Sequence, residues 1–279
     1  MDVEDNQQET ARHWLAGVFD AEGCVAVEKI SNPKSTRYYV SVRIYNKDFS
    51  IINHARKVLE NDGMTPYLFE NNEGVAAVIL KRREHLIKFF EIYTKLVQTK
   101  KDQCNLGRNL VFNNKCEKHF QELSERNKQK SGSSILFTRR ASDEENLHWL
   151  AGFLEGDGCI SMSKSAGKYR VYQYPRVTFH NVHSGTVQQI KDILDRFEIS
   201  YSCSSTFAGK KQKFPVWQIG VGSMKSVKRL LELLDGKLVG EKKGRREAML
   251  DMLSKKAGSS ESKCEAPESP VMMYSNGAV

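Results

Sequence analysis

A stretch of twelve residues occurs twice in the chain, and this repeat constrains the fold more than any other feature. Residues 13–24 read HWLAGVFDAEGC, and residues 148–159 read HWLAGFLEGDGC. Seven of the twelve positions are identical, and the other five keep their chemical type, with acid matching acid and small residue matching small residue. The copies lie 135 residues apart. This spacing predicts two similar halves, each large enough for a core of its own.

The hydrophobic patterns after each copy follow the same order in both halves. Each copy is predicted to be a helix, with Gly23 or Gly158 as its stop. Two alternating strands, an amphipathic helix, two short strands and a third helix follow. The predicted fold class is therefore α+β, built from two repeats. The predicted boundaries are an N-terminal half at 1–112, a linker at 113–142, a C-terminal half at 143–254 and a disordered tail at 255–279.

Small residues line one side of each repeated helix. Gly17 and Ala21 lie four residues apart in the first copy, as do Gly152 and Gly156 in the second. Two such strips can meet at backbone contact. We therefore expect the repeated helices to pack against each other and to join the halves.

Each repeated helix also ends in two acids. These are Asp20 and Glu22 in the first copy, and Glu155 and Asp157 in the second. The helix dipole disfavours a carboxylate in the last turn, and two such ends side by side would gather negative charge. For one copy alone, a solvated helix end is the simpler interpretation. Matched acids in two copies favour a site that holds a divalent cation.

The segments LAGVFDAEG (15–23) and LAGFLEGDG (150–158) resemble the two signature helices of the single-chain LAGLIDADG homing endonucleases. The resemblance extends over residues 10–254. It implies two pseudo-symmetric αββαββα repeats that pack through their motif helices and carry saddle-shaped antiparallel sheets.

The resemblance also assigns roles to individual residues. It implies that Glu22 and Asp157 bind metal, assisted by the backbone carbonyls of Ala21 and Gly156, while Asp20 and Glu155 support the helix ends. By the same resemblance, the catalytic lysines are Lys100 and Lys242, and the residues that orient water are Asn46 and Asn181.

The activity implied by the resemblance is metal-assisted hydrolysis of both strands of a long, non-palindromic DNA target, which leaves short 3′ overhangs. The implied cofactor is Mg²⁺, with Mn²⁺ able to substitute and Ca²⁺ binding without efficient cleavage. A monomer is expected. Two alternatives share the fold, namely a maturase that binds group I intron RNA and a DNA-binding regulator that does not cut. The presence of both acids and both lysines favours the nuclease.

In such a fold, the outer face of each sheet reads DNA in the major groove. If Val40, Val42 and Ile44 face inward in the first half, and Val171, Val177 and Phe179 in the second, the residues between them face outward. The outward candidates are Arg37, Tyr39, Ser41 and Arg43 in the first half, and Arg170, Tyr172, Tyr174, Arg176 and Thr178 in the second. The turn lysines that could reach phosphates are Lys34, Lys164, Lys168, Lys210, Lys211 and Lys213.

The composition agrees with a nucleic-acid partner. The formal net charge is +9 and the pI is near 9.1. The six cysteines form no CxxC pair, and HNVH at 180–183 has no nearby ligand set, so the sequence favours neither a zinc cluster nor a metal site at HNVH. No apolar run reaches membrane-spanning length, and the acidic N-terminus resembles no targeting signal, so we expect no membrane partner and leave the compartment open between an organelle (chloroplast or mitochondrion) and a prokaryotic cytoplasm.

Overall fold

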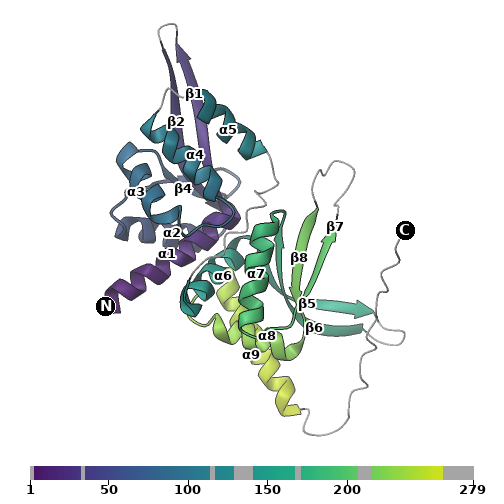
Figure 1. The fold of residues 1–279 in the computed structure, drawn as a ribbon. Helices are drawn as coiled ribbons and strands as arrows, with labels where there is room; N and C mark the ends of the chain where they lie inside the picture. The colour runs from purple at the N-terminus through teal and green to yellow at the C-terminus, as the bar shows by residue number, and fades with distance from the viewer. Residues whose placement is uncertain are drawn as a thin grey trace, which may run out of the picture.

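The two halves predicted from the repeat are both present in a computed structural model of the chain (Figure 1). The structure describes residues 3–32, 35–113, 117–128, 141–166, 171–206 and 215–259.

The N-terminal half consists of one antiparallel sheet and its helices. Its strands lie in the order β1-β2-β4-β3. Its elements are α1 (Val3–Glu22), β1 (Gly23–Asn32), β2 (Ser35–Asn46), α2 (Phe49–Asn61), β3 (Tyr67–Glu70), β4 (Ala76–Leu80), α3 (Arg83–Tyr93), α4 (Lys101–Phe112) and α5 (Glu117–Lys128).

The C-terminal half repeats this plan. Its sheet has the equivalent order β5-β6-β8-β7, again antiparallel. Its elements are α6 (Asp143–Asp157), β5 (Gly158–Ala166), β6 (Val171–Asn181), α7 (Ser184–Arg196), β7 (Ser202–Thr206), β8 (Val216–Val221), α8 (Met224–Leu233) and α9 (Glu241–Ser259). The predicted α+β class and the repeated architecture are thus confirmed, with further helices after the αββαββα unit, α4 and α5 in the first half and α9 in the second.

Part of the predicted linker is folded. Residues 117–128 form α5, which packs against β1 and α4. Leu123 is fully buried, the ring of Phe120 lies 4.8 Å from that of Tyr38, and Lys29 pairs with Glu117 at 3.1 Å. The helix covers apolar surface that the β1–β2 hairpin would otherwise expose, so it belongs to the N-terminal half. The remainder of the linker lies mostly outside the described residues, as does the predicted tail after Ser259, where α9 ends.

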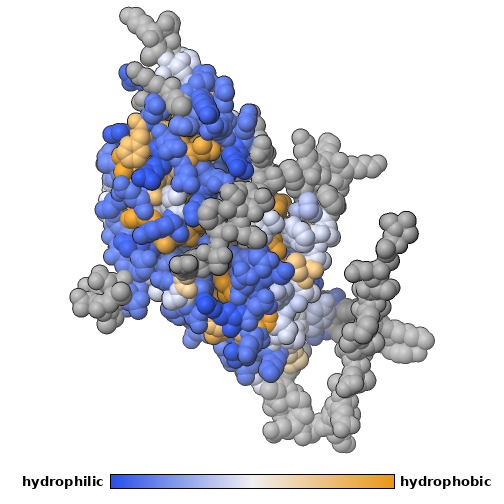
Figure 2. Space-filling view, in the orientation of Figure 1, coloured by the Kyte–Doolittle hydropathy of each residue, from blue (hydrophilic) through white to orange (hydrophobic). Residues whose placement is uncertain are grey.

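The sheets bury the face that the alternation predicts. Val40, Val42 and Ile44 are at most 7% exposed, and Val177 and Phe179 are at most 1% exposed. The predicted inward position of Val171 lies on β6, but its side chain lies outside the described residues. Polar side chains dominate the molecular face drawn in Figure 2. Among the described helices, none is both long enough and apolar enough to cross a membrane.

The helices α1 and α6 make the most extensive contact between elements, and they meet backbone to backbone. A Cβ atom added at Gly17 would lie 2.0 Å from the carbonyl oxygen of Trp149, and one added at Gly152 would lie 2.0 Å from that of Trp14. At Gly156 it would lie 2.4 Å from the Cβ of Ala21. The predicted contact between small-residue strips is confirmed, and it joins the halves.

The glycines after the two motif helices stop them for a steric reason. Gly158 has an extended backbone, with φ −112° and ψ 167°, and not the left-handed conformation typical of a glycine stop. Its added Cβ would lie 2.8 Å from the Cα of Leu154, and that of Gly23 would lie 2.4 Å from the carbonyl oxygen of Phe19. Glycine therefore lets each chain turn closely past the end of its own helix into the sheet.

Candidate active site at the ends of the motif helices

The two predicted metal-binding acids meet where α1 and α6 end. Glu22 is the last residue of α1, and Asp157 is the last residue of α6. The Glu22 side chain lies over Gly156, where an added Cβ would be 2.9 Å from the Glu22 Cγ and 3.6 Å from its Oε1. Ala21 and Gly156, whose carbonyls are candidate ligands, lie against each other between the acids. The close helix contact thus brings one acid from each half to a shared site.

The electrostatics of this site fit a divalent cation. Burial raises the pKa of Asp157 to about 6, and the neighbouring Glu22 carboxylate raises it as well, against opposing effects of Lys100, Asn181 and Lys242. Burial also raises the pKa of Glu22, while Lys242 and Lys100 lower it. Two half-buried carboxylates that repel each other lose this repulsion when a divalent cation binds between them. Glu22 and Asp157 are therefore a suitable donor set for such an ion.

The acids two residues earlier each hold the segment that begins a later helix of their own half, α4 for Asp20 and α9 for Glu155. Asp20 accepts hydrogen bonds from the backbone N–H groups of Gln98 at 2.7 Å, Thr99 at 2.8 Å and Lys100 at 3.1 Å, and from the indole N–H of Trp149 at 3.0 Å. Burial, opposed by these donors, raises the pKa of Asp20 to about 6. This carboxylate fixes the loop that begins α4.

Glu155 does the same for α9. Its Oε1 accepts hydrogen bonds from the N–H groups of Val239 at 2.6 Å and Gly240 at 2.9 Å. Both Asp20 and Glu155 are only 1% exposed. These two residues therefore hold the segments that begin α4 and α9.

The two predicted catalytic lysines lie beside the acids as a result. Lys100 is the N-cap of α4, and Lys242 lies in the first turn of α9. The Lys242 ammonium donates a hydrogen bond of 2.5 Å to the carbonyl oxygen of Glu155. Burial lowers the pKa of Lys242, and the nearby Glu155 and Glu22 carboxylates raise it. The site therefore pairs two acids with two cations.

The two predicted asparagines differ in their contacts. Asn181 donates a hydrogen bond of 3.2 Å from its Nδ2 to the Asp157 carboxylate and accepts one of 2.8 Å from the His183 backbone. Asn46 accepts the equivalent backbone bond from Asp48 at 2.8 Å. Among the described contacts, only Asn181 touches an acid of the site.

The predicted DNA-reading residues fall into three groups. Arg37 and Tyr39 are exposed, and Arg43, Tyr174 and Arg176 are partly exposed, on the face away from the core. Lys164 is also exposed, but it lies on β5 and not on a turn as predicted, and its pairing with Gln173 places it on the core side of the sheet. Ser41 and Thr178 lie on this outer face but are buried, at 4% and 6% exposure. Arg43 covers Ser41 by a 2.8 Å hydrogen bond. Outside the described residues lie Lys34, Lys168, Arg170, Lys210, Lys211, Lys213 and the side chain of Tyr172.

The chain matches a known protein family over most of its length. A family model described as a LAGLIDADG-like domain matches residues 9–123 and 144–235. The chain belongs to the LAGLIDADG family. Each matched segment contains one motif helix and one sheet, which is the two-motif, single-chain form of the homing endonuclease family.

Solved structures share the fold at low sequence identity. The I-LtrWI LAGLIDADG homing endonuclease bound to target DNA has a TM-score of 0.70 at 16% identity, over 90% of this chain and 92% of that one. The LAGLIDADG meganuclease I-AabMI bound to uncleaved DNA has a TM-score of 0.61 at 19% identity, over 90% and 94%. I-SmaMI bound to cleaved DNA has a TM-score of 0.67 at 14% identity, over 89% and 90%. No curated protein matches the chain.

The start of the second helix of each LAGLIDADG repeat contacts a segment of the other repeat, namely the one that contains Lys100 or Lys242. The Asp48 carboxylate, which caps α2, accepts a 2.6 Å hydrogen bond from the backbone of Glu241. His183, at the equivalent place before α7, has its pKa lowered to about 4 by burial and by Lys100. Thr186 and Thr99 share a hydrogen bond between their hydroxyls. The sequence reasoning missed these residues, although the N-cap positions of Asp48 and His183 were a visible signal.

The two LAGLIDADG sheets present different chemistry on their outer faces. The strand register places four exposed apolar or aromatic side chains on the N-terminal sheet, namely Ile30, Tyr39, Tyr67 and Phe69. The equivalent face of the C-terminal sheet is rich in hydroxyls, namely those of Ser161, Ser163, Ser202, Ser204 and Thr206. The two faces therefore suit different surfaces on a partner.

Proposed function

We propose that the protein is a monomeric, site-specific homing endonuclease that cuts both strands of a DNA duplex and leaves short 3′ overhangs. The observation that carries this proposal is the meeting of Glu22 and Asp157, one from each half, beside Lys100 and Lys242. Two equivalent sets of groups suit two strands. Solved structures of the same fold that contain bound DNA support a DNA target.

Each group in the site has a proposed task. Glu22 and Asp157, with the carbonyls of Ala21 and Gly156, would hold divalent ions, with Mg²⁺ preferred, Mn²⁺ able to substitute and Ca²⁺ binding without efficient cleavage. A bound Mg²⁺ polarises a scissile phosphate and makes water a stronger nucleophile. The ammonium groups of Lys100 and Lys242 stabilise the negative charge that develops on the phosphate.

Two further groups would complete the site. Asn181 holds the Asp157 carboxylate in place, and its side chain, with that of Asn46, orients water.

The net charge of +9 provides the general attraction to a polyanion. Since the outer sheet faces differ, the target is long and non-palindromic.

A comparison of nucleic acids tests this function against the two alternatives. The protein would be incubated with randomised duplex DNA and with structured group I intron RNA, in Mg²⁺ and in Ca²⁺. We expect cutting of the duplex in Mg²⁺ and retention of the same duplex in Ca²⁺. Tight binding to RNA alone would favour the maturase, and tight binding to one duplex without cutting in any divalent ion would favour the regulator.

Replacement of the lysines is expected to separate the two strand cuts. Lys100→Met should slow the cleavage of one DNA strand by about 10²- to 10³-fold, and Lys242→Met should slow the cleavage of the opposite strand. The reason is that each ammonium group stabilises charge at a different phosphate. The measurement is the cleavage rate of each strand, followed on a duplex labelled at both 5′ ends. Each variant should accumulate nicked DNA. Lys243→Met, at the exposed neighbour of Lys242, is the control and should cut both strands normally. Equal slowing of both strands by each variant would contradict the assignment.

Phe69→Ser is expected to weaken a preference for thymine in the half-site that the N-terminal sheet reads. Phe69 is 53% exposed on the outer face, and apolar side chains contact the thymine methyl group in the major groove. The measurement is base selection at each position of the target before and after the change. Leu68→Ser is the matched control, because Leu68 is 41% exposed on the same strand but pairs with the buried Val78 on the opposite face. A selection profile that Phe69→Ser leaves unchanged would count against this reading.

A further inference from the structure

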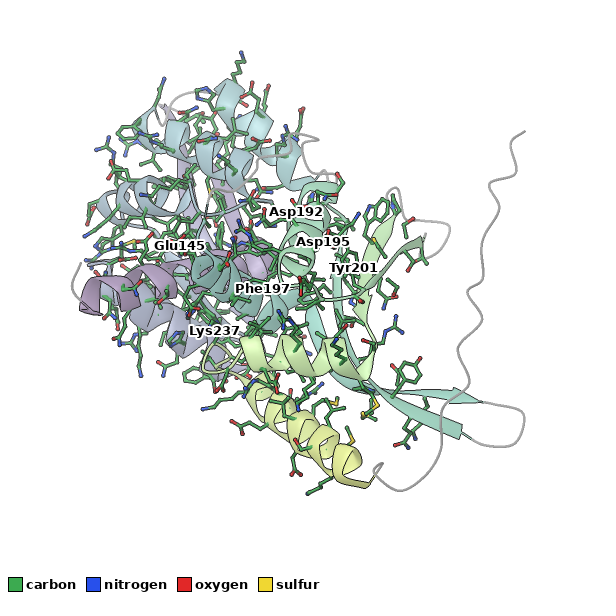
Figure 3. All side chains as sticks on the ribbon, turned by 60° about the horizontal axis from the view of Figure 1, so that its bottom comes forward. Glu145, Asp192, Asp195, Phe197, Tyr201 and Lys237 are labelled. Carbon is green, nitrogen blue, oxygen red and sulfur yellow. The ribbon has the colours of Figure 1, made fainter. Side chains whose placement is uncertain are left out.

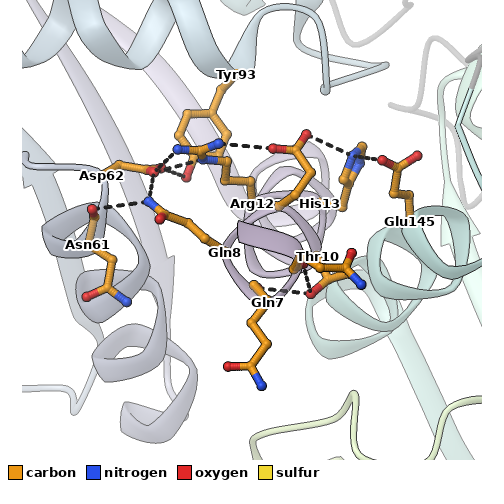
Figure 4. Close-up of polar contacts among 11 residues, drawn as sticks. Gln7, Gln8, Thr10, Arg12, His13, Asn61, Asp62, Tyr93 and Glu145 are labelled. Atoms are coloured by element: carbon orange, nitrogen blue, oxygen red, sulfur yellow. Dashed lines mark hydrogen bonds and ion pairs between the residues drawn. The ribbon is translucent and has the colours of Figure 1, made fainter. Parts of the chain in front are cut away.

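A second group of possible metal ligands lies far from the catalytic acids, where the first turn of α6 meets the middle of α1 (Figure 4). It consists of Glu9 and His13 on α1 and Glu145 on α6; His13 and Glu145 are labelled in Figure 4. The His13 Nε2 lies 3.5 Å from the Glu9 Oε1 and 3.4 Å from the Glu145 Oε1. These three atoms all lie within 4.8 Å of one another. On α1, His13 is nine residues before Glu22, or roughly 13 Å along the helix axis.

In each of the Glu9 and Glu145 carboxylates, one oxygen accepts a hydrogen bond and the other oxygen faces the imidazole of His13. The Arg12 guanidinium donates a 3.0 Å hydrogen bond to the Glu9 Oε2. The backbone N–H of Ser142 donates a 2.6 Å bond to the Glu145 Oε2, within the capping box that begins α6. The remaining Oε1 atoms are the ones that approach His13. The two carboxylates are therefore already oriented toward a common centre.

His13 is itself prepared for a ligand. The residue is only 4% exposed, and its Nδ1 has no hydrogen-bond partner among the described residues. Its Nε2 points to the two carboxylates. Through its Nε2, this buried imidazole can offer one nitrogen donor beside two anionic oxygen donors.

We propose that Glu9, His13 and Glu145 bind a divalent transition-metal ion of the Zn²⁺ type. Zn²⁺ is bound by histidine nitrogen and carboxylate oxygen at about 2 Å, which places neighbouring donor atoms roughly 3.3 Å apart. The observed separations of 3.5 and 3.4 Å from Nε2 need little movement. Imidazole suits Zn²⁺ and its neighbours in the first transition row, whereas Mg²⁺ prefers oxygen donors. The ion links the N-terminal half to the C-terminal half.

The second half contains a natural counterpart that lacks the third ligand. His148 is the equivalent of His13 and lies 3.1 Å from Glu144, the equivalent of Glu9. There the Lys237 ammonium lies 2.9 Å from the Glu144 carboxylate. Figure 3 labels Lys237, together with Glu145 of the proposed site. An ammonium group offers no lone pair to a metal ion and repels it. The proposed site is therefore specific to the His13 side, and Glu144 provides a matched control.

The test uses the full chain with Glu22→Gln and Asp157→Asn, so that the catalytic acids take no part. Zn²⁺ is titrated by calorimetry, and the melting temperature is followed with Zn²⁺ and with Mg²⁺. We expect one equivalent of Zn²⁺ to bind and to raise the melting temperature by several degrees, and Mg²⁺ to do neither. Acidification should weaken Zn²⁺ binding, because the ligand nitrogen must be unprotonated.

Glu145→Gln, added to that background, is expected to lose this equivalent and the shift in melting temperature. The glutamine keeps the capping box of α6, so the fold should survive the change. Glu144→Gln should leave both readouts unchanged and controls for Zn²⁺ bound at cysteines or other histidines. Absence of Zn²⁺ binding, or equal binding by the two variants, would overturn the proposal and leave the three residues as an ion-pair cluster. Neither result depends on nuclease activity.

Discussion

Asp157→Asn is expected to abolish DNA cleavage and, at the same time, to stabilise the protein in the absence of DNA and metal. Cleavage should fall by about 10³-fold or more, since the variant loses an anionic ligand from the proposed metal site. Stability should rise because the free protein holds this carboxylate in an unfavourable place, where burial and the nearby Glu22 raise its pKa to about 6. Glu22→Gln should lose cleavage in the same way. A group that costs stability but is required for activity is typical of a functional site.

The pH dependence gives the sign of this effect. The pKa of Asp157 is higher in the folded state than its ordinary value of 3.8, so the folded state binds the proton more tightly. The cost of the charge is therefore absent below about pH 4, grows between about pH 4 and pH 6, and is complete above that range. At pH 7 we expect Asp157→Asn to be more stable than the parent by about 2 kcal/mol.

Urea denaturation at a series of pH values measures this difference. The stability gap between parent and variant should open between pH 4 and pH 6. Asp251→Asn, which changes an exposed acid on α9, is the control and should show no such gap. A variant that is less stable than the parent at pH 7, or a gap of equal size at pH 4 and pH 7, would contradict the account of the acid pair.

Gly17→Ala is expected to destabilise the protein by about 4 kcal/mol or more, a very large loss for one added methyl group. The new Cβ would lie 2.0 Å from the carbonyl oxygen of Trp149 and 2.8 Å from the backbone nitrogen of Phe153. Backbone atoms cannot yield as side chains do, so α1 and α6 would have to move apart along their whole contact. Urea denaturation, or loss of soluble protein, measures the effect.

Gly244→Ala is the control for the same chemical change. Gly244 lies exposed in α9 with no atom within 4 Å of an added Cβ. Alanine there should raise stability by about 1 kcal/mol through helix propensity. If Gly17→Ala and Gly244→Ala had similar stability, the backbone contact between the motif helices would not hold the halves together.

The features that the sequence predicts are those with a local pattern that occurs twice. The alternation of Val40, Val42 and Ile44 fixes the buried face of the first sheet. The spacing of Gly17 and Ala21, repeated in the second copy, indicates the helix contact, and the matched acids indicate the site between the halves. In each case a short segment contains the whole signal.

The features that it does not predict depend on residues far apart in the chain. α5 has a mostly polar sequence, and its place is set by the distant partners of Phe120 and Leu123. Ser41 points outward as the alternation requires, but the Arg43 side chain covers it. The alternation of residues along a strand does not indicate whether a neighbouring side chain will bury an outward-facing residue. His183 lies beside Lys100 of the other half, a relation that only the packed fold creates.

The most direct test of the central claim is the sequencing of DNA ends cut from a randomised duplex library in Mg²⁺, with Glu22→Gln and Asp157→Asn in parallel. The account predicts one long, non-palindromic site, cut on both strands across the minor groove with short 3′ overhangs, and no cutting by either variant. Cutting that persists in either variant, or a duplex that is bound tightly and never cut by the parent protein in any divalent ion, would contradict it.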